Sequence, residues 1–511
     1  LPMKYSLLQR VHPDTEPAAV RRYRDLFEGG EALRARIADY LPKNEQEPAP
    51  VYLRRCARAH YLNYSARIVR WFAAALFGCP PVYRSEPEAP EWYTARLKED
   101  ADGAGTDLDV VLRDAFTRAL VAGRAYVRVE RPEPGEVAPL SLADADRAGL
   151  RDVRVCPVPT EHVRHWRRNP DGSFAWVLEH QRREELVELA DATPTITETW
   201  TLWREDGTAQ RWELAYKADR KPTATTDIPE VEAPTTFGVI PLIELQLPCE
   251  LHLMRHIADA QVELFRKRNA LSWAVDRTCY AMPAFFLKDR KKPPVMGTGY
   301  YLILGENEKV EWPAPPSAPF EVIQSITREL VQEIHRVVEQ MALAVDNNAA
   351  AAVGRSGDSK DADSRATQIV LPAFGVHVRE FAETVLDVVA LARGESLTWS
   401  VEGMDRYEGV DASTIVDTAL ASDPLGIPSV THRRELFKAV SRAMLPHVRE
   451  DVRAAIDREI EAGVNAEDVL RESTVPPPGG KNGPDSSVPP DGGDGNDPSI
   501  PPPPRVPREM Q

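Results

Sequence analysis

The sequence predicts an α+β fold in which helical and β regions follow one another along the chain. Apolar residues recur at three- and four-residue spacing over residues 16–77, alternate with polar residues after Gly123, and return to helical spacing from residue 251. The chain has 511 residues, which is more than one ordinary hydrophobic core uses. We therefore expect several domains or subdomains.

The first region is expected to be helical. The stretches "AAVRRYRDLFEGGEALRARIADYL" and "YLRRCARAHYLNYSARIVRWFAAALF" both carry apolar stripes at helical spacing. A further helix is expected in "LDVVLRDAFTRALVAG", because Thr106 and Asp107 before it are good N-cap residues and Gly123 can end it.

The residues after Gly123 are expected to form an antiparallel sheet. Apolar and polar residues alternate in "RAYVRVERP" and "VRVCPV". Asp171-Gly172 and Asp206-Gly207 each separate two alternating runs, and Asp-Gly favours the tight turn of a β-hairpin.

Two long helices with a small β insert between them are expected next. The first covers residues 251–278, the insert covers 280–319, and the second helix begins at residue 320. The second helix carries one apolar stripe, which consists of Val322, Ile326, Leu330, Ile334, Val337, Met341 and Val345.

Two basic clusters lie in this part of the chain. Arg266-Lys267-Arg268 indicates the ordinary solvated face of a helix. The cluster in the insert could instead meet a partner or a phosphate backbone. Its members are Lys288, Arg290, Lys291 and Lys292.

The polar stretch "DNNAAAAVGRSGDSKDADSRATQ" interrupts the helical pattern. A helix is expected after it over residues 364–393, with a kink or break at Pro372 and Gly375. "LTWSV" then predicts a strand, and residues 411–463 are helical again with a break at "SDPLGIPS". The Pro- and Gly-rich residues from 473 onward have too few apolar groups to fold, so we predict disorder there.

Composition limits the function classes. The net charge of −16, from 63 basic and 79 acidic residues, argues against a bulk surface that grips nucleic acid. The five cysteines form no C-x-x-C pair, which indicates isolated buried thiols in a reducing compartment. "LPMKYSLLQRVHP" has no sustained apolar region and "IVRWFAAALFGCPP" is too short to cross a bilayer, so we expect a soluble intracellular chain without a secretory signal.

Motif searches favour no enzymatic chemistry. The chain has no phosphate-binding G-x-x-x-x-G-K-[ST] loop and no G-x-S-x-G nucleophile motif. "DADGAGTDLDVVL" begins like a calcium loop, but Ala104 and Val111 occupy ligand positions, which favours a solvated loop before a capped helix. His252 and His256 lack a third metal ligand and indicate surface or packing histidines. We expect no catalytic residue, no cofactor and no bound metal.

Three stretches resemble bacteriophage portal proteins of the long-tailed phage branch. These are "YRDLFEGGEALRARIADYLP", "ARAHYLNYSARIVRWFAAALFGCPPVY" and "GTDLDVVLRDAFTRALVAGRAYVRVERP", together with the order helix, β insert, helix, polar loop and helix over residues 251–393. The resemblance covers roughly residues 20–470 and rests on apolar and turn patterns without a catalytic signature.

The resemblance implies a domain order. It assigns a wing to residues 1–250, stem helices to 251–279 and 320–346 with a clip at 280–319 between them, a tunnel loop to 347–363, a wing helix and return strand to 364–410, a crown to 411–472 and a disordered tail to 473–511. DNA-facing residues are then expected in the tunnel loop and at the start of the wing helix: Asn347, Asn348, Arg355, Ser356, Lys360 and Arg365. The clip residues expected to contact terminase, adaptor or DNA are Lys288, Arg290, Lys291 and Lys292.

The resemblance also implies partners. They are further copies of the chain in a ring, typically of twelve, double-stranded DNA in transit, the terminase large subunit, a head–tail adaptor, and the major capsid and scaffolding proteins, with no membrane. The expected location is the portal vertex of the virion, after assembly in the host cytoplasm. An acidic chain offers DNA a wall of weak affinity, which suits transit.

Two alternatives stay open. A metal-dependent phage nuclease could use the carboxylates of Asp100, Asp102, Asp107 and Asp109. The other alternative is a different structural protein of the head or tail, such as an adaptor.

Overall fold

The structure is a computed structural model of the chain. It describes residues 2–78, 81–131, 141, 144, 146, 149, 151–186, 193–234, 236–278, 284–286, 309–311, 318–345, 359–404, 430–444 and 450–462. The chain divides into two compact units, Leu1–Glu408 and Gly409–Gln511, which are described separately. No helix among the described residues is long and apolar enough to cross a membrane.

The N-terminal helical region is confirmed. Its helices are α1 (Tyr5–Leu8), α2 (Pro17–Glu28), α3 (Gly30–Ala35), α4 (Ile37–Tyr40), α5 (Ala49–Arg58), α6 (Tyr64–Leu76) and α7 (Leu108–Ala122). Asp107 is the N-cap of α7, where its side chain accepts a 2.8 Å hydrogen bond from the Asp109 backbone N–H. Gly123 ends the helix in the left-handed conformation at φ 79°, which glycine adopts without strain.

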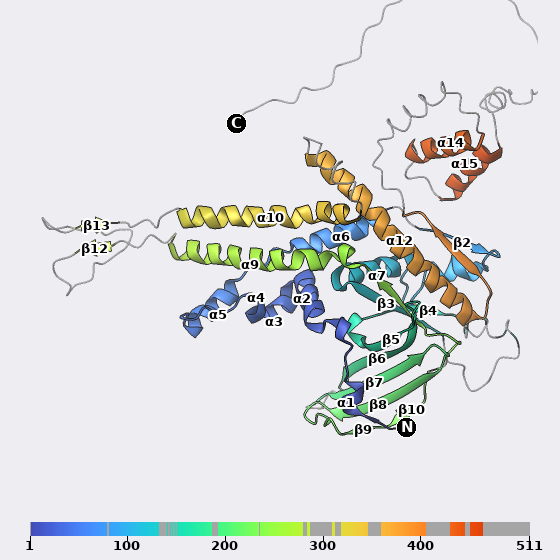
Figure 1. Ribbon diagram of the computed structural model, residues 1–511, viewed down its shortest axis with the longest axis horizontal. Coiled ribbons are helices and arrows are strands. Elements are labelled where there is room, and N and C mark those ends of the chain that lie inside the picture. Colours follow the sequence, from blue (N-terminus) through green and yellow to red (C-terminus); the bar gives the residue numbers. More distant parts are fainter. Residues whose placement is uncertain are drawn as a thin grey trace, which may run out of the picture. The chain divides into compact units, whose positions relative to one another are not determined.

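The antiparallel β region is also confirmed and forms two main sheets (Figure 1). The first has the order β11 (Leu242–Gln246), β3 (Arg124–Glu130) and β4 (Arg154–Val158). The second has the order β10 (Glu230–Val231), β8 (Ala209–Lys217), β7 (Thr195–Arg204), β6 (Phe174–Glu185) and β5 (Val163–Arg168). Gly172 and Gly207 take positive φ in the two predicted hairpin turns, at 90° and 74°.

Two long helices follow the sheets and lie side by side in Figure 1. They are α9 (Leu253–Thr278) and α10 (Ala318–Val345), and a short antiparallel pair, β12 (Ala284–Phe286) with β13 (Lys309–Glu311), lies between them in sequence. The predicted order of helix, β insert and helix is therefore confirmed.

The helix after the polar stretch differs from its prediction. α12 (Ser359–Arg393) begins five residues before the expected residue 364 and runs through Pro372 without a break. Of the expected kink or break, the break is wrong, because the side chains around the proline are packed into the core: Leu371 is 2% exposed and Phe374 is fully buried. The strand predicted in "LTWSV" is confirmed as β14 (Thr398–Glu402), which pairs with β2 (Val82–Glu86).

One large apolar core joins these elements within the first unit. It includes side chains from α6, α7, α9, α10 and α12, such as Phe72, Phe116, Phe265, Ile334 and Phe374. A smaller core lies on the five-stranded sheet around Trp200 and Trp212, where the short pair of β1 (Met3–Lys4) and β9 (Asp227–Ile228) contributes Ile228. The long helices are thus anchored at one end in the main core.

The second unit contains two described helices, α14 (Val430–Met444) and α15 (Glu450–Ala462). Lys438 on α14 donates to Glu435 on the same helix and to Glu461 on α15, both at 2.9 Å. The helix expected to end at Gly463 is confirmed, whereas "SDPLGIPS" and the tail from residue 473 lie outside the described residues.

Three of the five cysteines are described, and all three are free thiols. Cys56 and Cys156 are half-buried, and burial raises the pKa of Cys156 to about 11. Cys249 is exposed, so the expectation of a buried thiol is wrong at that position, which lies on the surface just before α9.

Candidate functional site

The pair formed by α9 and α10 is the principal candidate for a functional element. The helices have 26 and 28 residues, which corresponds to about 39 and 42 Å at 1.5 Å per residue. The predicted α10 stripe is buried at Ile334, Val337 and Met341, but Val322 near the start of the helix is 58% exposed. Burial of the stripe therefore fades towards the end that carries the β insert.

Two buried amides fix α9 against the segment before and at the start of α6. Asn269 Oδ1 accepts a 2.9 Å hydrogen bond from the His60 backbone N–H. Gln261 Oε1 accepts from the backbone N–H groups of Tyr64 and Ser65, at 3.2 and 3.3 Å. Both amides are at most 6% exposed, and Ser65 is fully buried, so losing Gln261 would leave the Ser65 backbone N–H buried without a partner. The rest of α9 towards Thr278 extends beyond these anchors.

A groove with a volume of about 480 Å³ lies between α9 and α10, and Asn269 and its partner His60 line one part of it. α9 contributes Arg268, Leu271 and Val275 to its walls, and α10 contributes Gln324 and Arg328. No carboxylate belongs to the described residues that line it. Within the described part of the chain, no ion pair is recorded for Arg268 or Arg328, so the groove is electropositive and suits an anionic group.

The basic cluster at the middle of α9 is not a single solvated face. Arg266 donates through Nε to the Tyr40 carbonyl at 2.8 Å, and Lys267 pairs with Glu263 at 3.2 Å. Only Arg268 lines the groove. The three neighbouring cations therefore have three different surroundings.

The residues expected to face DNA are largely outside the described part of the chain. This applies to Asn347, Asn348, Arg355 and Ser356 and to the clip residues Lys288, Arg290, Lys291 and Lys292. Lys360 and Arg365 lie on α12, and only their backbone is described. Residues 359–363, assigned to the tunnel loop from sequence, are the first residues of α12.

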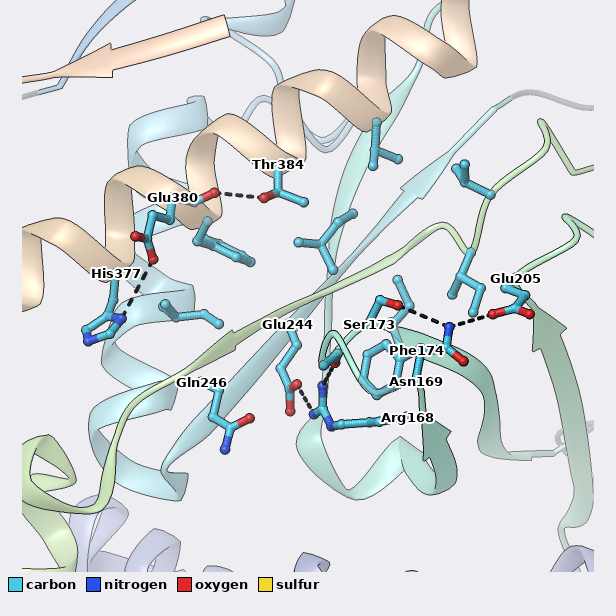
Figure 2. Close-up of a pocket in the computed structure, with 18 residues that line it drawn as sticks. Arg168, Asn169, Ser173, Phe174, Glu205, Glu244, Gln246, His377, Glu380 and Thr384 are labelled. Carbon is cyan, nitrogen blue, oxygen red and sulfur yellow. Dashed lines mark hydrogen bonds and ion pairs between the residues drawn. The ribbon is translucent and has the colours of Figure 1, made fainter.

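A second pocket, with a volume of about 550 Å³, lies between α12, β11 and the β5–β6 turn (Figure 2). Its polar side chains are joined to one another: Arg168 pairs with Glu244, Asn169 donates to Glu205 at 2.5 Å, and His377 pairs with Glu380 at 4.0 Å. Figure 2 shows the α12 residues on one wall and the turn residues on the other. These contacts brace the wall of the pocket and bring no nucleophile together with a base among the residues that line it.

The acidic loop before α7 uses its carboxylates for its own structure. Asp100 accepts from the Gly105 backbone N–H at 2.8 Å, and Asp102 accepts from those of Ala104 and Thr106, at 2.8 and 3.1 Å. Asp109 accepts a hydrogen bond from the Tyr83 hydroxyl, and burial together with that carboxylate raises the pKa of Tyr83. The prediction of a loop before a capped helix is confirmed, and the described residues contain no cluster of acidic, histidine or cysteine side chains that could hold a metal.

His252, just before α9, is a packing residue, and His256 on α9 is an exposed surface residue, so the prediction of surface or packing histidines is confirmed. His252 Nε2 lies 3.1 Å from the Val121 carbonyl oxygen, and burial lowers the pKa of His252 to about 4. His256 Nε2 lies 3.2 Å from the carbonyl oxygens of Cys249 and Glu250.

No protein-family model matches the chain, and no curated protein sequence matches it. The chain is similar, at 13% identity, to chains in three solved structures. Two of them are the neck of an empty GTA particle computed with C6 symmetry and the neck of a native GTA particle computed with C12 symmetry, each with a TM-score of 0.36 and an alignment that covers 72% of this chain and 88% of that chain. The third is the virion of a native gene transfer agent (GTA) particle, with a TM-score of 0.37 and an alignment that covers 82% of this chain and 98% of that chain. TM-scores below 0.5 do not establish a shared fold.

The groove between α9 and α10 was not found from sequence. Its charged residues are separated by sixty residues along the chain and come together only because the two helices pack side by side. The sequence signal for the groove is the position of Arg328, a cation that lies between the stripe residues Ile326 and Leu330.

Proposed function

We propose that the chain is a portal subunit, which forms a ring at one capsid vertex and provides the channel for packaging and ejection of the viral genome. The observation that carries the proposal is the long antiparallel pair of α9 and α10 with the β12–β13 pair between them in sequence. This is the element order that the sequence resemblance implies for stem and clip. In the ring, α9 and α10 would form the stem, and α12 would follow the tunnel loop.

The surface of the helix pair supports assembly. Val275 and Val322 are 36% and 58% exposed on helices that are otherwise anchored in the main core. Exposed apolar residues on a projecting element are typical of a surface that another chain covers. A ring closes when each subunit contacts the next through two different surfaces.

The partners follow from the proposal. The β insert, whose predicted basic cluster includes Lys288 and Arg290, would meet the terminase large subunit and a head–tail adaptor. The predicted wing, residues 1–250, would contact the major capsid and scaffolding proteins. Double-stranded DNA would pass through the centre of the ring. The subunit itself would perform no chemistry, and ATP hydrolysis would belong to the terminase.

Electron microscopy of the purified full-length chain tests the proposal. We expect rings with a central channel, most of them with twelve subunits, once the protein concentration is high enough for assembly. A monodisperse monomer over the whole accessible concentration range would overturn the proposal.

A further inference from the structure

The groove between α9 and α10 has a complementary surface on the same helix pair. Gln324 and Arg328 of α10 face the groove. At about 100° per residue, Val322 and Glu329 lie about 160° and 140° around the helix from Gln324. Val322 and Glu329, with Glu333 one turn after Glu329, thus form an exposed ridge on the opposite side of α10, which we call the α10 ridge. Arg336 lies about one turn after Glu333 and ends the acidic part of the α10 ridge.

The two surfaces match in chemistry. The groove offers the apolar side chains of Leu271 and Val275 and the guanidinium groups of Arg268 and Arg328. The α10 ridge offers one exposed apolar side chain followed by carboxylates. Glu329 is exposed and accepts only a 3.3 Å hydrogen bond from the Ser325 hydroxyl among the contacts recorded for the described residues.

The two surfaces also match in spacing along the helices. Seven residues separate Val275 from Arg268 in the groove, and seven separate Val322 from Glu329 on the ridge, which is about 10 Å in each case. α9 ends and α10 begins at the end of the pair that carries the β insert, so Val275, three residues before the end of α9, and Val322, four residues after the start of α10, lie at similar heights (Figure 1). The apolar part of each surface therefore lies at the same height along the helix pair, and so does the charged part.

We propose that the groove between α9 and α10 receives the α10 ridge of a neighbouring copy of the chain. This deepens the proposed function and rests on it, because it names the surfaces that join one stem to the next. A rotation about an axis parallel to the helices keeps each residue at its own height, so surfaces that match at equal heights fit a closed ring. The contact pairs Arg328 with Glu329 of the next copy and covers Val275 and Val322.

Two charge reversals separate the two sides of the contact. Arg328→Glu places a carboxylate in the groove, and Glu329→Arg places a guanidinium on the ridge. The residues are adjacent in sequence but about 100° apart on the helix, so each variant alters one surface and leaves the other unchanged. Arg167→Glu on β5, which is also an exposed arginine, is the matched control.

Assembly is measured as the protein concentration at which half of the chains are in rings, by light scattering and electron microscopy at low salt. Each single variant alone brings like charges together at every junction, and we expect that concentration to rise about tenfold or more. An equimolar mixture of the two variants assembles like the wild type, because alternating subunits restore opposite charges at every junction of an even-numbered ring. The double variant also recovers, and the Arg167→Glu protein is unchanged.

The outcomes separate this inference from the portal proposal. If the wild type forms rings and both single variants assemble as it does, the pairing of groove and ridge is wrong while the portal proposal stands. If the single variants assemble poorly and their equimolar mixture also assembles poorly, the pairing of groove and ridge is again wrong. If the wild type forms no ring, the portal proposal itself falls.

Discussion

His252 shows how one side chain links parts of the core that are far apart in sequence. Its ring lies edge-on to Tyr23 of α2, with 5.3 Å between the centroids, and its Nε2 lies 3.1 Å from the Val121 carbonyl oxygen at the end of α7. The same ring lies 3.0 Å from where a Cβ at Gly123 would be placed. The imidazole is enclosed on these sides, and this burial is the main cause of its low pKa.

The pKa of His252 predicts a pH dependence of stability. In the unfolded chain histidine binds a proton at a pKa of about 6.5. In the folded chain the pKa is about 4, so between these values the unfolded state binds more protons. The free energy of unfolding should therefore fall as the pH is lowered from 6.5 to 4, by about 1 to 3 kcal/mol from this residue.

The His252→Gln variant tests this pH dependence by urea unfolding at several pH values. The variant should show a smaller loss of stability than the wild type across the window. Part of the loss should persist in it, because burial also lowers the pKa values of His12 and His162. Identical pH profiles for the two proteins would show that His252 does not change its protonation on unfolding.

At the scale of elements, α12 and β14 meet through a close backbone contact. A Cβ on Gly375 would overlap the carbonyl oxygen of Met404, which follows β14. Met404 itself has a positive φ of 55°, which is uncommon for a residue with a side chain. Arg379, one turn after Gly375, donates to the Gly403 carbonyl at 2.6 Å and fixes the same segment against the helix.

The Gly375→Ala variant should therefore destabilise the protein, even though alanine favours helices. The added methyl group must push α12 away from Met404, at a cost of about 1 to 3 kcal/mol, and amide hydrogens of β14 should exchange faster. Val376→Ala is the matched control, since Val376 is 42% exposed and its change should stay within about 0.5 kcal/mol. Equal thermal stability of the two variants would argue against the close contact.

At the scale of the whole molecule, the elements that sequence predicts well are those with local signals. Asp171-Gly172 and Asp206-Gly207 mark both hairpins because their turn chemistry is contained in a few residues. The pairing of β2 with β14 joins segments about three hundred residues apart and has no such signal. At Pro372 a strong local signal for a helix break is overridden by burial of the residues beside it, and α12 continues through the proline.

The candidate site divides in the same way. The existence and order of α9 and α10 follow from their periodicity, but the groove depends on which sides of the two helices face each other. Val322 illustrates the limit: its spacing places it in the apolar stripe, yet it is exposed in the single chain. In the proposed ring, its place in that stripe is explained by the neighbouring copy, which would cover it.

The segment between α10 and α12 gives the last prediction, which belongs to the assembled ring. Val345 and Ser359 leave thirteen residues between the two helices. A deletion that tests the predicted tunnel loop must end before Ser359, because residues 359–363 form the first turn of α12. A deletion of Ala349–Ala352 leaves nine residues, which can span about 30 Å when extended.

We expect the Ala349–Ala352 deletion to form rings as the wild type does but to package several-fold less DNA, because the proposed tunnel loop would no longer reach the DNA in the channel. Packaging is measured as nuclease-protected DNA in particles assembled with each variant. Replacement of the four alanines by Gly-Ser-Gly-Ser keeps the length and should preserve packaging, which separates the reach of the loop from its composition. Unchanged packaging by the shortened protein would mean that this segment only connects α10 to α12, and the loss of rings would mean that it also supports assembly.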